Sequence, residues 1–412
     1  VPLFLFLLPQ LLAQAKVGGL GTISGLNGFY LGCLVDPNGE VALATDLLGY
    51  FPLYYAIVSD RIFFASSPGL IKQLADAHFE PSPFGIAGVL LTMHIVDGQT
   101  IWKGIYRLSG GSMLHVHPQK GLSVVSGRRL EPSCRFFGLS LNESNEMLAA
   151  ALETAVARYV RGRSVSVMLS GGLDSRLASG GLHAQGGQRL TAVTFGQRGD
   201  YEMICAAAVA RCLGWRHIAR REDYKQYSAL ARLQLGTEQL SNSFTDLAWW
   251  SGNSLFRELG KPVLTGFIGD SIMGGSHIDW GEDKVTGEYG FEPLYRRING
   301  YGFSPAQVDQ LIRRDFFGGR AADVKEALRA FYDALPGESF QKVWAFDLTH
   351  RQRFHVAPFA WRLSFGAWPL MPFADRDMID LVGGMPRHLL VNRVAQTFML
   401  KTRFPRLARL PL

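Results

Sequence analysis

Short apolar runs alternate with amphipathic stretches through the middle of the chain. Three of these runs have the length of strands, and they span 165–169, 190–195 and 263–265. Apolar side chains also recur at helical spacing over 146–159, from 176 onward and over 200–213. Strands that alternate with helices predict an α/β fold with a doubly wound parallel sheet. Ligands in such sheets bind beyond the carboxyl ends of the strands, so we expect a site in the loops that follow these runs.

The first part of the chain has a different pattern, in which short strands are separated by turn residues. Strand-like runs span 41–45, 53–58, 61–65 and 112–116. A short helix capped by Ser66 or Ser67 is predicted to end at 77. We therefore predict an α+β domain over 1–117, a polar connector over 118–145 and an α/β domain over 146–412, with a mainly helical end.

Composition narrows the choice of ligand and of compartment. The 412 residues include 47% hydrophobic and 19% charged residues, which is typical of a globular chain. The net charge is +7, but the basic residues are scattered, so we expect a small anionic ligand and no nucleic acid. Four cysteines without a CxxC pair favour a reducing cytosol and a cytoplasmic location. The apolar run Leu3 to Leu8 is too short to cross a membrane; we interpret it as a buried helix, with a signal peptide as the alternative.

The most specific motif follows the first of the three central strands: Ser170-Gly171-Gly172-Leu173-Asp174-Ser175. Two glycines let the backbone approach an anion closely, and free N–H groups at the start of the next helix favour phosphate. Asp174 would repel phosphate unless a divalent cation lay between them, so the motif also implies Mg2+. A Walker loop would end in a lysine, which this segment lacks. The alternative is a glycine-rich surface turn.

This loop resembles the pyrophosphatase loop of the N-type ATP pyrophosphatases, and among them that of the asparagine synthetase family, which includes β-lactam synthetases and lasso-peptide cyclases. The resemblance implies an adenine nucleotide α-hydrolase-like domain whose loop binds the pyrophosphate of ATP. It also implies that a carboxylate is adenylated on the α-phosphate and that an amine then displaces AMP. In the family, the positions of Leu169 and Phe195 line the adenine and ribose site, although core packing would also explain Phe195.

A second segment, Leu264 to Gly275, is similar to the family's Ser-Gly-Glu-Gly-x-Asp-Glu-x-x-x-Gly-Gly segment. The resemblance places Thr265 and Gly266 against the nucleotide and Asp270 at the second carboxylate linked to Mg2+. Asp174 and Asp270 would then hold the metal against phosphate oxygens and act as the catalytic pair. For Asp270 alone, the alternative is an acid that caps the turn after it.

The chain departs from the family pattern at three positions in this domain. Phe267 and Ser271 stand where the family has glutamates. The resemblance therefore does not specify aspartate as the carboxylate substrate or ammonia as the nitrogen donor. The family also keeps a catalytic lysine near its C-terminus. We interpret Lys401, the only late lysine, as a surface cation on a helix, which places the expected lysine beyond this chain.

The segment Asp46 to Tyr55 resembles part of the family's N-terminal glutaminase, an Ntn-hydrolase-like domain. The family's glutaminases use an N-terminal cysteine as nucleophile, whereas this chain begins with Val1. The first cysteine is Cys33, inside an apolar strand, where we expect an inaccessible and unactivated thiol. The resemblance therefore implies a truncated or degenerate glutaminase domain over 1–117 that does not hydrolyse glutamine by itself.

Together these features predict an ATP- and Mg2+-dependent ligase similar to glutamine-hydrolysing asparagine synthase. Its substrates would be a small-molecule or peptide carboxylate and an amine or ammonia donor. Closure of a macrolactam or β-lactam is one alternative, and an inactive ATP-binding partner protein is another. We expect no membrane partner, and a homodimer or a partner that supplies substrate is possible.

Overall fold

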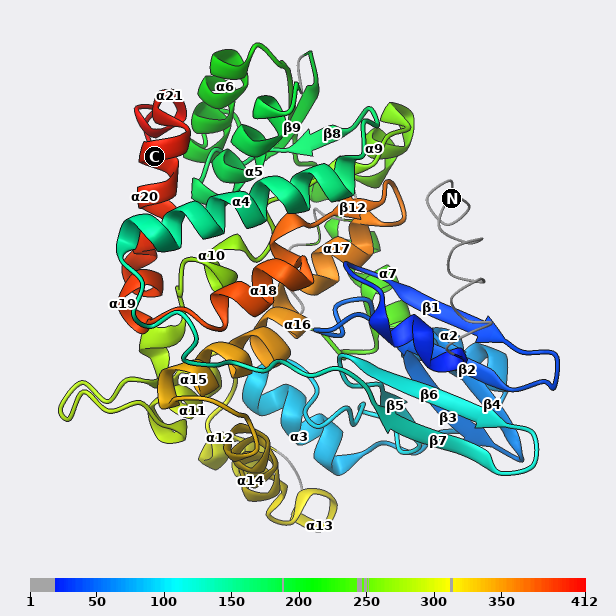
Figure 1. Ribbon diagram of the computed structural model, residues 1–412. Coiled ribbons are helices and arrows are strands. Elements are labelled where there is room, and N and C mark those ends of the chain that lie inside the picture. The colour runs from blue at the N-terminus through cyan, green and yellow to red at the C-terminus, as the bar shows by residue number, and fades with distance from the viewer. Residues whose placement is uncertain (1–18, 187–188, 243–246, 248–249, 251, 312–313) are drawn as a thin grey trace.

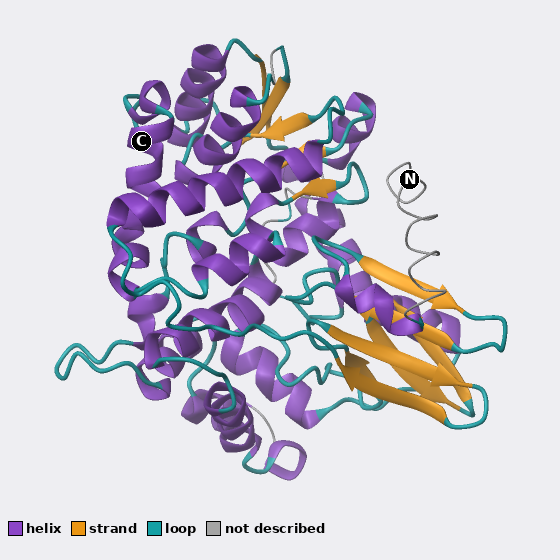
Figure 2. Ribbon diagram, viewed as in Figure 1, coloured by secondary structure: helices purple, strands orange, loops and turns teal. Residues whose placement is uncertain are grey.

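The computed structural model describes residues 19–412, except 187–188, 243–246, 248–249, 251 and 312–313. Two antiparallel sheets form the N-terminal part, and a parallel sheet with many helices forms the rest (Figure 1). Figure 2 shows the same division by element type, with helices predominating outside the N-terminal sheets.

A four-stranded and a three-stranded sheet make up the N-terminal part. The first has the order β1-β2-β6-β7, formed by Leu31–Val35, Val41–Thr45, Ser112–His117 and Gly121–Ser126. The second has the order β4-β3-β5, formed by Arg61–Ala65, Tyr54–Val58 and Ile105–Arg107. A cluster of buried leucines connects the sheets: Leu43, Leu53, Leu108 and Leu114. The predicted α+β fold of the N-terminal part is therefore confirmed.

Three short helices flank these sheets: η1 Leu20–Gly25, α2 Pro68–Ala75 and α3 Pro83–Thr92. The hydroxyl of Ser67 accepts a hydrogen bond of 3.1 Å from the backbone N–H of Leu70. Ser67 is therefore the N-cap of α2, as one of the two predicted options.

The structure differs from the predicted connector over 118–145 at its start. Strand β7 lies there, and it pairs with β6 as a hairpin, with Leu122 opposite Val116 and Val124 opposite Leu114. Most residues of β7 are exposed, so its pairing with β6, and not a buried face, places it in the sheet. The four-stranded sheet thus continues beyond residue 117.

Helix α4, Leu141–Val160, begins earlier than the predicted 146 because of a capping box. The hydroxyl of Ser140 accepts from the N–H of Glu143 at 3.3 Å, and the carboxylate of Glu143 accepts from the N–H of Ser140 at 2.8 Å. The apolar face of α4, including Leu148, Leu152 and Val156, is buried.

The parallel sheet has five strands in the order β10-β9-β8-β11-β12. They are Arg216–Arg221, Thr191–Gly196, Ser166–Met168, Val263–Leu264 and Pro369–Leu370. Every pair in this sheet is parallel. The α/β prediction is confirmed, and β10 and β12 are two strands that the sequence pattern did not predict.

Helices connect and cover these strands. Those between β8 and β11 are α5 Leu173–Ala184, α6 Tyr201–Leu213, η2 Tyr224–Gln226, α7 Tyr227–Glu238 and α9 Asn253–Leu259. Those between β11 and β12 are α10 Gly269–Ile272, η3 Ile278–Gly281, α11 Phe291–Asn299, α12 Pro305–Leu311, α13 Arg314–Phe317, α14 Arg320–Asp333, α15 Ser339–Asp347, η4 Leu348–Gln352, α16 Arg353–His355 and α17 Ala357–Leu363. Those after β12 are η5 Pro372–Ala374, α18 Arg376–Val382, α19 Arg387–Leu390, η6 Val391–Arg393, α20 Val394–Arg403 and α21 Pro405–Ala408.

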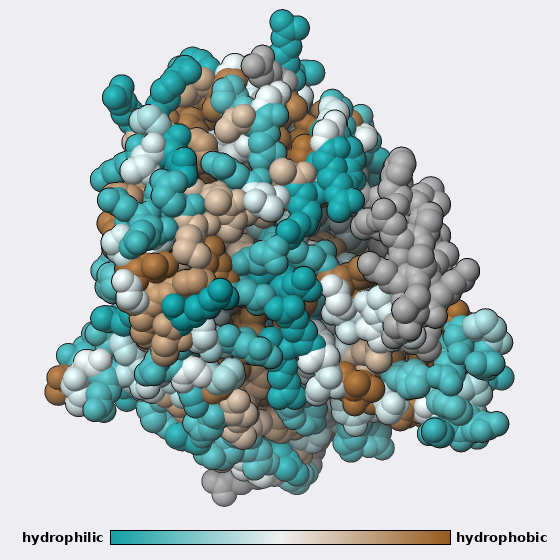
Figure 3. Space-filling model, viewed as in Figure 1, coloured by the Kyte–Doolittle hydropathy of each residue, from teal (hydrophilic) through white to brown (hydrophobic). Residues whose placement is uncertain are grey.

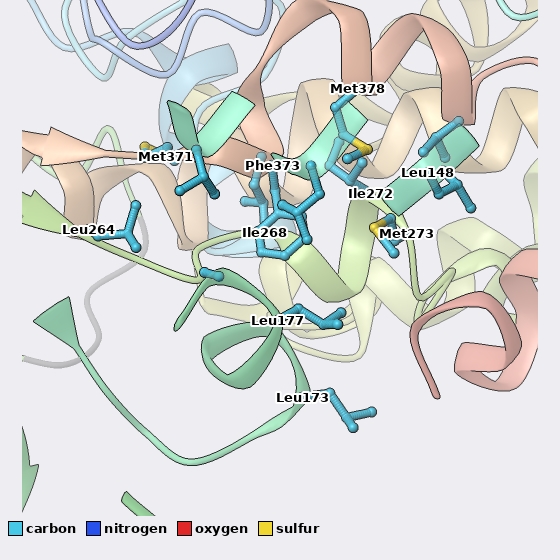
Figure 4. Close-up of a cluster of buried hydrophobic side chains, with 14 of the residues drawn as sticks. Leu148, Leu173, Leu177, Leu264, Ile268, Ile272, Met273, Met371, Phe373 and Met378 are labelled. Atoms are coloured by element: carbon cyan, nitrogen blue, oxygen red, sulfur yellow. The ribbon is translucent and has the colours of Figure 1, made fainter. Parts of the chain in front are cut away.

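One hydrophobic core joins the parallel sheet to its surrounding helices. Figure 4 shows side chains from several elements meeting in it, among them Leu148, Leu177, Leu264, Ile272, Phe373 and Met378. Polar residues predominate on the face shown in Figure 3, with smaller apolar patches between them. Among the described helices, none combines the length and the hydropathy of a membrane span.

Polar and aromatic contacts join the two parts of the chain. The carboxylate of Asp375 accepts hydrogen bonds from Asn27 at 3.0 Å and from Arg158 at 2.6 Å. The rings of Phe29, Phe51 and Trp368 pack together, with centroid separations of 5.2 to 6.0 Å. The N-terminal part is thus packed directly against the α/β domain.

Candidate functional site

The predicted phosphate-binding loop connects the end of β8 to the start of α5. Gly171 has a φ of 79°, and a Cβ there would lie 2.6 Å from the backbone of Cys205 and Ala206, so only glycine fits. The hydroxyls of Ser170 and Ser175 are 3.1 Å apart. No side chain caps the N-terminus of α5, so its first N–H groups are available to an anion.

Asp174 and Asp270 come from different loops and face each other at this point. The backbone N–H of Asp270 donates a hydrogen bond to Asp174. Burial and the nearby charge of Asp270 raise the pKa of Asp174 to about 7. Two glycines allow this approach, because a Cβ at Gly266 would lie 2.8 Å from the backbone N of Ser175, and one at Gly269 would lie 2.8 Å from Cγ of Asp174.

Asp270 lies within the short helix α10 rather than in a cap position, and its side chain is 30% exposed. The alternative was that Asp270 caps a turn. No side-chain hydrogen bond caps α10, so the structure gives this alternative no support. The carboxylate instead has Nη2 of Arg393 at 3.9 Å.

Two residues that the sequence did not indicate support the aspartates from α20 and the turn before it. The amide of Gln396 donates to Oδ1 of Asp174 at 2.5 Å, and the side chain of Gln396 is fully buried. Arg393 reaches Asp270 from a left-handed backbone, with φ values of 58° at Asn392 and 59° at Arg393. Strained backbone of this kind persists where surrounding contacts hold it.

A cleft of about 540 Å³ opens beside the two aspartates. Its walls come from the ends of β8 and β9, from the loop after β11, and from α9 and α17. Its polar lining residues include Ser170, Asp174, Ser175 and Asp270. Thr194, Glu202 and Glu222 also line it, and most of the other side chains are apolar or aromatic, as is typical of a small-molecule site.

Most of the predicted site residues meet at this cleft. Those that line it are Leu169, Ser170, Asp174, Ser175, Phe195, Gly266 and Asp270. Gly171 and Gly172 shape the loop behind it, whereas Leu173 and Thr265 are buried. The hydroxyl of Thr265 donates to the carbonyl of Leu370 at 3.3 Å, so it ties β11 to β12.

The donor set at the cleft fits a hard divalent cation. Asp174 and Asp270 offer carboxylate oxygens, and a cation between them would relieve the repulsion that raises the pKa of Asp174. In the described part of the chain, no group of three or more His, Cys, Asp or Glu side chains could hold a metal. Two carboxylates are a set of protein ligands that Mg2+ commonly uses, together with phosphate oxygens and water.

Lys401, the late lysine of the sequence, is exposed on α20. Its exposure agrees with the interpretation of a surface helix cation. The basic group that reaches the predicted metal pair from this end of the chain is instead the guanidinium of Arg393.

In the N-terminal part, Cys33 lies on β1, as expected, but its side chain is exposed. The expectation of an inaccessible thiol is therefore wrong, because successive side chains of a strand point to opposite faces. Partial burial raises the pKa of the Cys33 thiol, which disfavours the reactive thiolate.

The segment from Asp46 forms a tight buried turn. The Asp46 carboxylate accepts from the N–H groups of Leu48, Tyr50 and Phe51 at 2.8 to 3.2 Å. Gly49 has a φ of 65°, and a Cβ there would lie 2.8 Å from Cα of Gly110. These contacts give the segment a structural role within the N-terminal part.

Comparison with protein families finds a match in each part of the chain. The family described as asparagine synthase matches residues 147–403, which is more than half of the chain. The family described as glutamine amidotransferase domain matches residues 10–124. Among curated proteins, no relative matches the chain.

Proposed function

Because this chain belongs to the asparagine synthase family, we propose that it is a carbon–nitrogen ligase that uses ATP to join a substrate carboxylate to an amine or ammonia. The observation that carries the proposal is the meeting of Asp174 and Asp270 beside the predicted phosphate-binding loop, in the lining of a cleft of about 540 Å³. A cleft of this size falls in the range that small-molecule sites occupy.

The reaction has two steps. An oxygen of the substrate carboxylate attacks the α-phosphorus of ATP, and the bond to the bridging oxygen breaks as pyrophosphate leaves. The nitrogen of the amine then attacks the acyl carbon, loses a proton, and AMP leaves with the electron pair of the broken C–O bond.

The loop and the aspartates supply what the first step needs. N–H groups at the start of α5, with the hydroxyls of Ser170 and Ser175, would hold phosphate oxygens. Mg2+ held by Asp174 and Asp270 would offset charge on the pyrophosphate leaving group. Gln396 and Arg393 would keep these carboxylates in place.

The second step requires a proton acceptor for the amine. Phe267 lines the cleft and cannot accept a proton. Apart from the two aspartates, the carboxylates among the described lining residues are Glu202 and Glu222. Phe267 supports an amine other than ammonia, which includes closure of a macrolactam or β-lactam within one substrate.

The test uses the full chain with MgATP. We expect calorimetry to detect binding of MgATP, and we expect release of pyrophosphate and AMP when a carboxylate and an amine are both present. Asp174→Asn and Asp270→Asn should each lower pyrophosphate release by about 100-fold. Asp333→Asn, which changes an exposed aspartate on α14, is the matched control.

The outcomes separate the candidates. Binding of MgATP without turnover for any acid and amine would contradict the ligase and favour an ATP-binding partner protein. Absence of MgATP binding by the folded chain would refute both. Turnover with aspartate and ammonia would identify an asparagine synthase activity.

A further inference from the structure

Residues from both sides of the loop after β8 line the cleft, and we call these sides the β9 half and the β11 half. The loop follows β8, which lies between β9 and β11 in the sheet. On the β9 side, Phe195 and Phe256 line the cleft with ring centroids 5.8 Å apart. On the β11 side, Phe267, Val356 and Phe359 line it. ATP reacts at its α-phosphate, so the adenosine and the substrate acid must occupy different halves.

The β9 half suits the nucleotide base. Phe195 and Phe256 provide aromatic surface, and Gly252 beside them leaves room, since a Cβ there would lie 2.8 Å from the ring of Phe195. With adenosine in this half, the acid that attacks the α-phosphate lies in the β11 half.

The apolar wall of the β11 half is held in place by its surroundings. Phe267 follows Gly266, which packs against the backbone of Ser175, and precedes Ile268, which has a φ of 60°. The guanidinium of Arg362 lies 5.7 Å from the ring centre of Phe359. Arg362 itself is fully buried and pairs with Glu238 at 2.7 Å. Because both rings have fixed supports, this wall offers a preformed apolar surface.

The charged side chains among the described lining residues of the cleft are all acidic. Its described lining residues include four acids, Asp174, Asp270, Glu202 and Glu222, and no lysine, arginine or histidine. Of these acids, Asp270 lies on the β11 side, whereas Glu202 on α6 and Glu222 after β10 lie on the β9 side. The guanidinium of Arg393 lies 3.9 Å from Asp270 and pairs with it. A second carboxylate on the substrate would therefore meet an apolar wall and Asp270, with no unpaired cation among the described lining residues.

We infer that the acid activated in this cleft is an apolar monocarboxylate whose side group packs against Phe267, Val356 and Phe359. This inference rests on the proposed function and specifies its substrate class. The carboxylate group would lie next to the α-phosphate, and the alkyl or aryl group would bury its surface on the aromatic wall.

ATP–pyrophosphate exchange tests the inference, because it reports the first step without the amine. The full chain is assayed with Mg2+, ATP and one of four acids: pentanoate, 3-phenylpropanoate, glutarate or aspartate. Pentanoate and glutarate have the same chain length and differ only by the second carboxylate. We expect exchange with pentanoate and 3-phenylpropanoate to exceed exchange with glutarate and aspartate by about tenfold or more.

Two variants test whether the apolar wall sets the preference for monocarboxylates over dicarboxylates. Phe359→Ala should raise the KM for 3-phenylpropanoate by about tenfold, because it removes part of the wall. Phe267→Lys should move the preference toward glutarate by supplying a cation. Phe64→Ala, which changes a ring that is 42% exposed on β4, is the control for loss of an aromatic ring and should keep the preference of the original chain.

The results distinguish a failure of this inference from a failure of the proposed function. Equal or faster exchange with glutarate or aspartate overturns the inference and leaves the proposed function intact. Exchange with no acid of the panel, while MgATP still binds, also overturns the inference. A folded chain that binds no MgATP refutes the proposed function and with it the inference.

Discussion

Nε of Arg176 donates a hydrogen bond of 2.6 Å to the carbonyl oxygen of Gly171, inside the predicted phosphate-binding loop. The same guanidinium donates to the carbonyls of Leu407 at 2.9 Å and Leu410 at 3.0 Å, and to that of Pro411. The side chain is fully buried. Arg176 therefore connects the loop 170–175 to residues 407–411 through hydrogen bonds.

The first prediction concerns this link. Arg176→Met keeps much of the buried volume but leaves several carbonyl oxygens without a donor, and we expect it to lower the free energy of unfolding by roughly 3 kcal/mol. Urea unfolding followed by circular dichroism measures this change. Arg320→Met, at an arginine with a 50% exposed side chain, should change stability by less than about 0.5 kcal/mol. An equal effect of both substitutions would contradict the role of Arg176.

The second prediction concerns the contact between Gln396 and Asp174. Gln396→Leu removes the amide that donates to Oδ1 of Asp174, so the carboxylate loses the partner that orients it. We expect MgATP binding to weaken by about tenfold, as for other groups that orient metal ligands. Calorimetry measures the Kd. Lys401→Ala, at an exposed position on the same helix, should leave the Kd unchanged.

The sequence predicted the centre of the site because its parts are local in the chain. The loop from Ser170 to Ser175 joins a strand to a helix within a few residues, and each residue type there has a local physical reason. Asp270 follows its own strand in the same way. Since parallel strands end at one edge, two such loops were expected to meet.

The sequence did not indicate Gln396, β10 or β12, because the residues around each of them form no recognisable pattern. Gln396 lies 222 residues from Asp174 along the chain, and nothing in its own segment marks it. Strand β10 is mostly polar because it lies at the sheet edge, and β12 has only two residues, so neither gives an apolar run. Tertiary packing decides such elements, and the pattern of the segment does not.

The third prediction concerns Arg393, whose guanidinium lies 3.9 Å from Asp270 at the cleft. Arg393→Ala removes positive charge near the expected pyrophosphate, so we expect release of pyrophosphate to slow by about tenfold. Stability should change by less than about 0.5 kcal/mol, because this side chain is 44% exposed. Steady-state kinetics measure the rate, and Arg393→Lys should restore part of it. If Arg393→Ala released pyrophosphate as fast as the original chain, a role of the Arg393 charge in this step would be excluded.

Three histidines are packed together where the two parts of the chain meet. The ring of His94 stacks on Phe354 at 4.7 Å and has the rings of His350 and His355 at 6.2 and 5.6 Å. Burial, with the charge of Arg107 as a smaller cause, lowers the pKa of His94 to about 4. Burial also lowers the pKa of His355 to about 3 and that of His350 well below its usual range. The folded chain therefore holds these rings neutral at pH values where the unfolded chain protonates them.

The fourth prediction follows from this difference. Between pH 6.5 and 4 the unfolded chain binds a proton at His94 and the folded chain does not, so stability falls as the pH falls. At about pH 5, His94 alone should cost about 2 kcal/mol relative to neutral pH. Urea unfolding at both pH values measures this loss, and His94→Gln should reduce it. His78→Gln, at an exposed position, should keep the original loss, and an unchanged loss in His94→Gln would contradict the assignment.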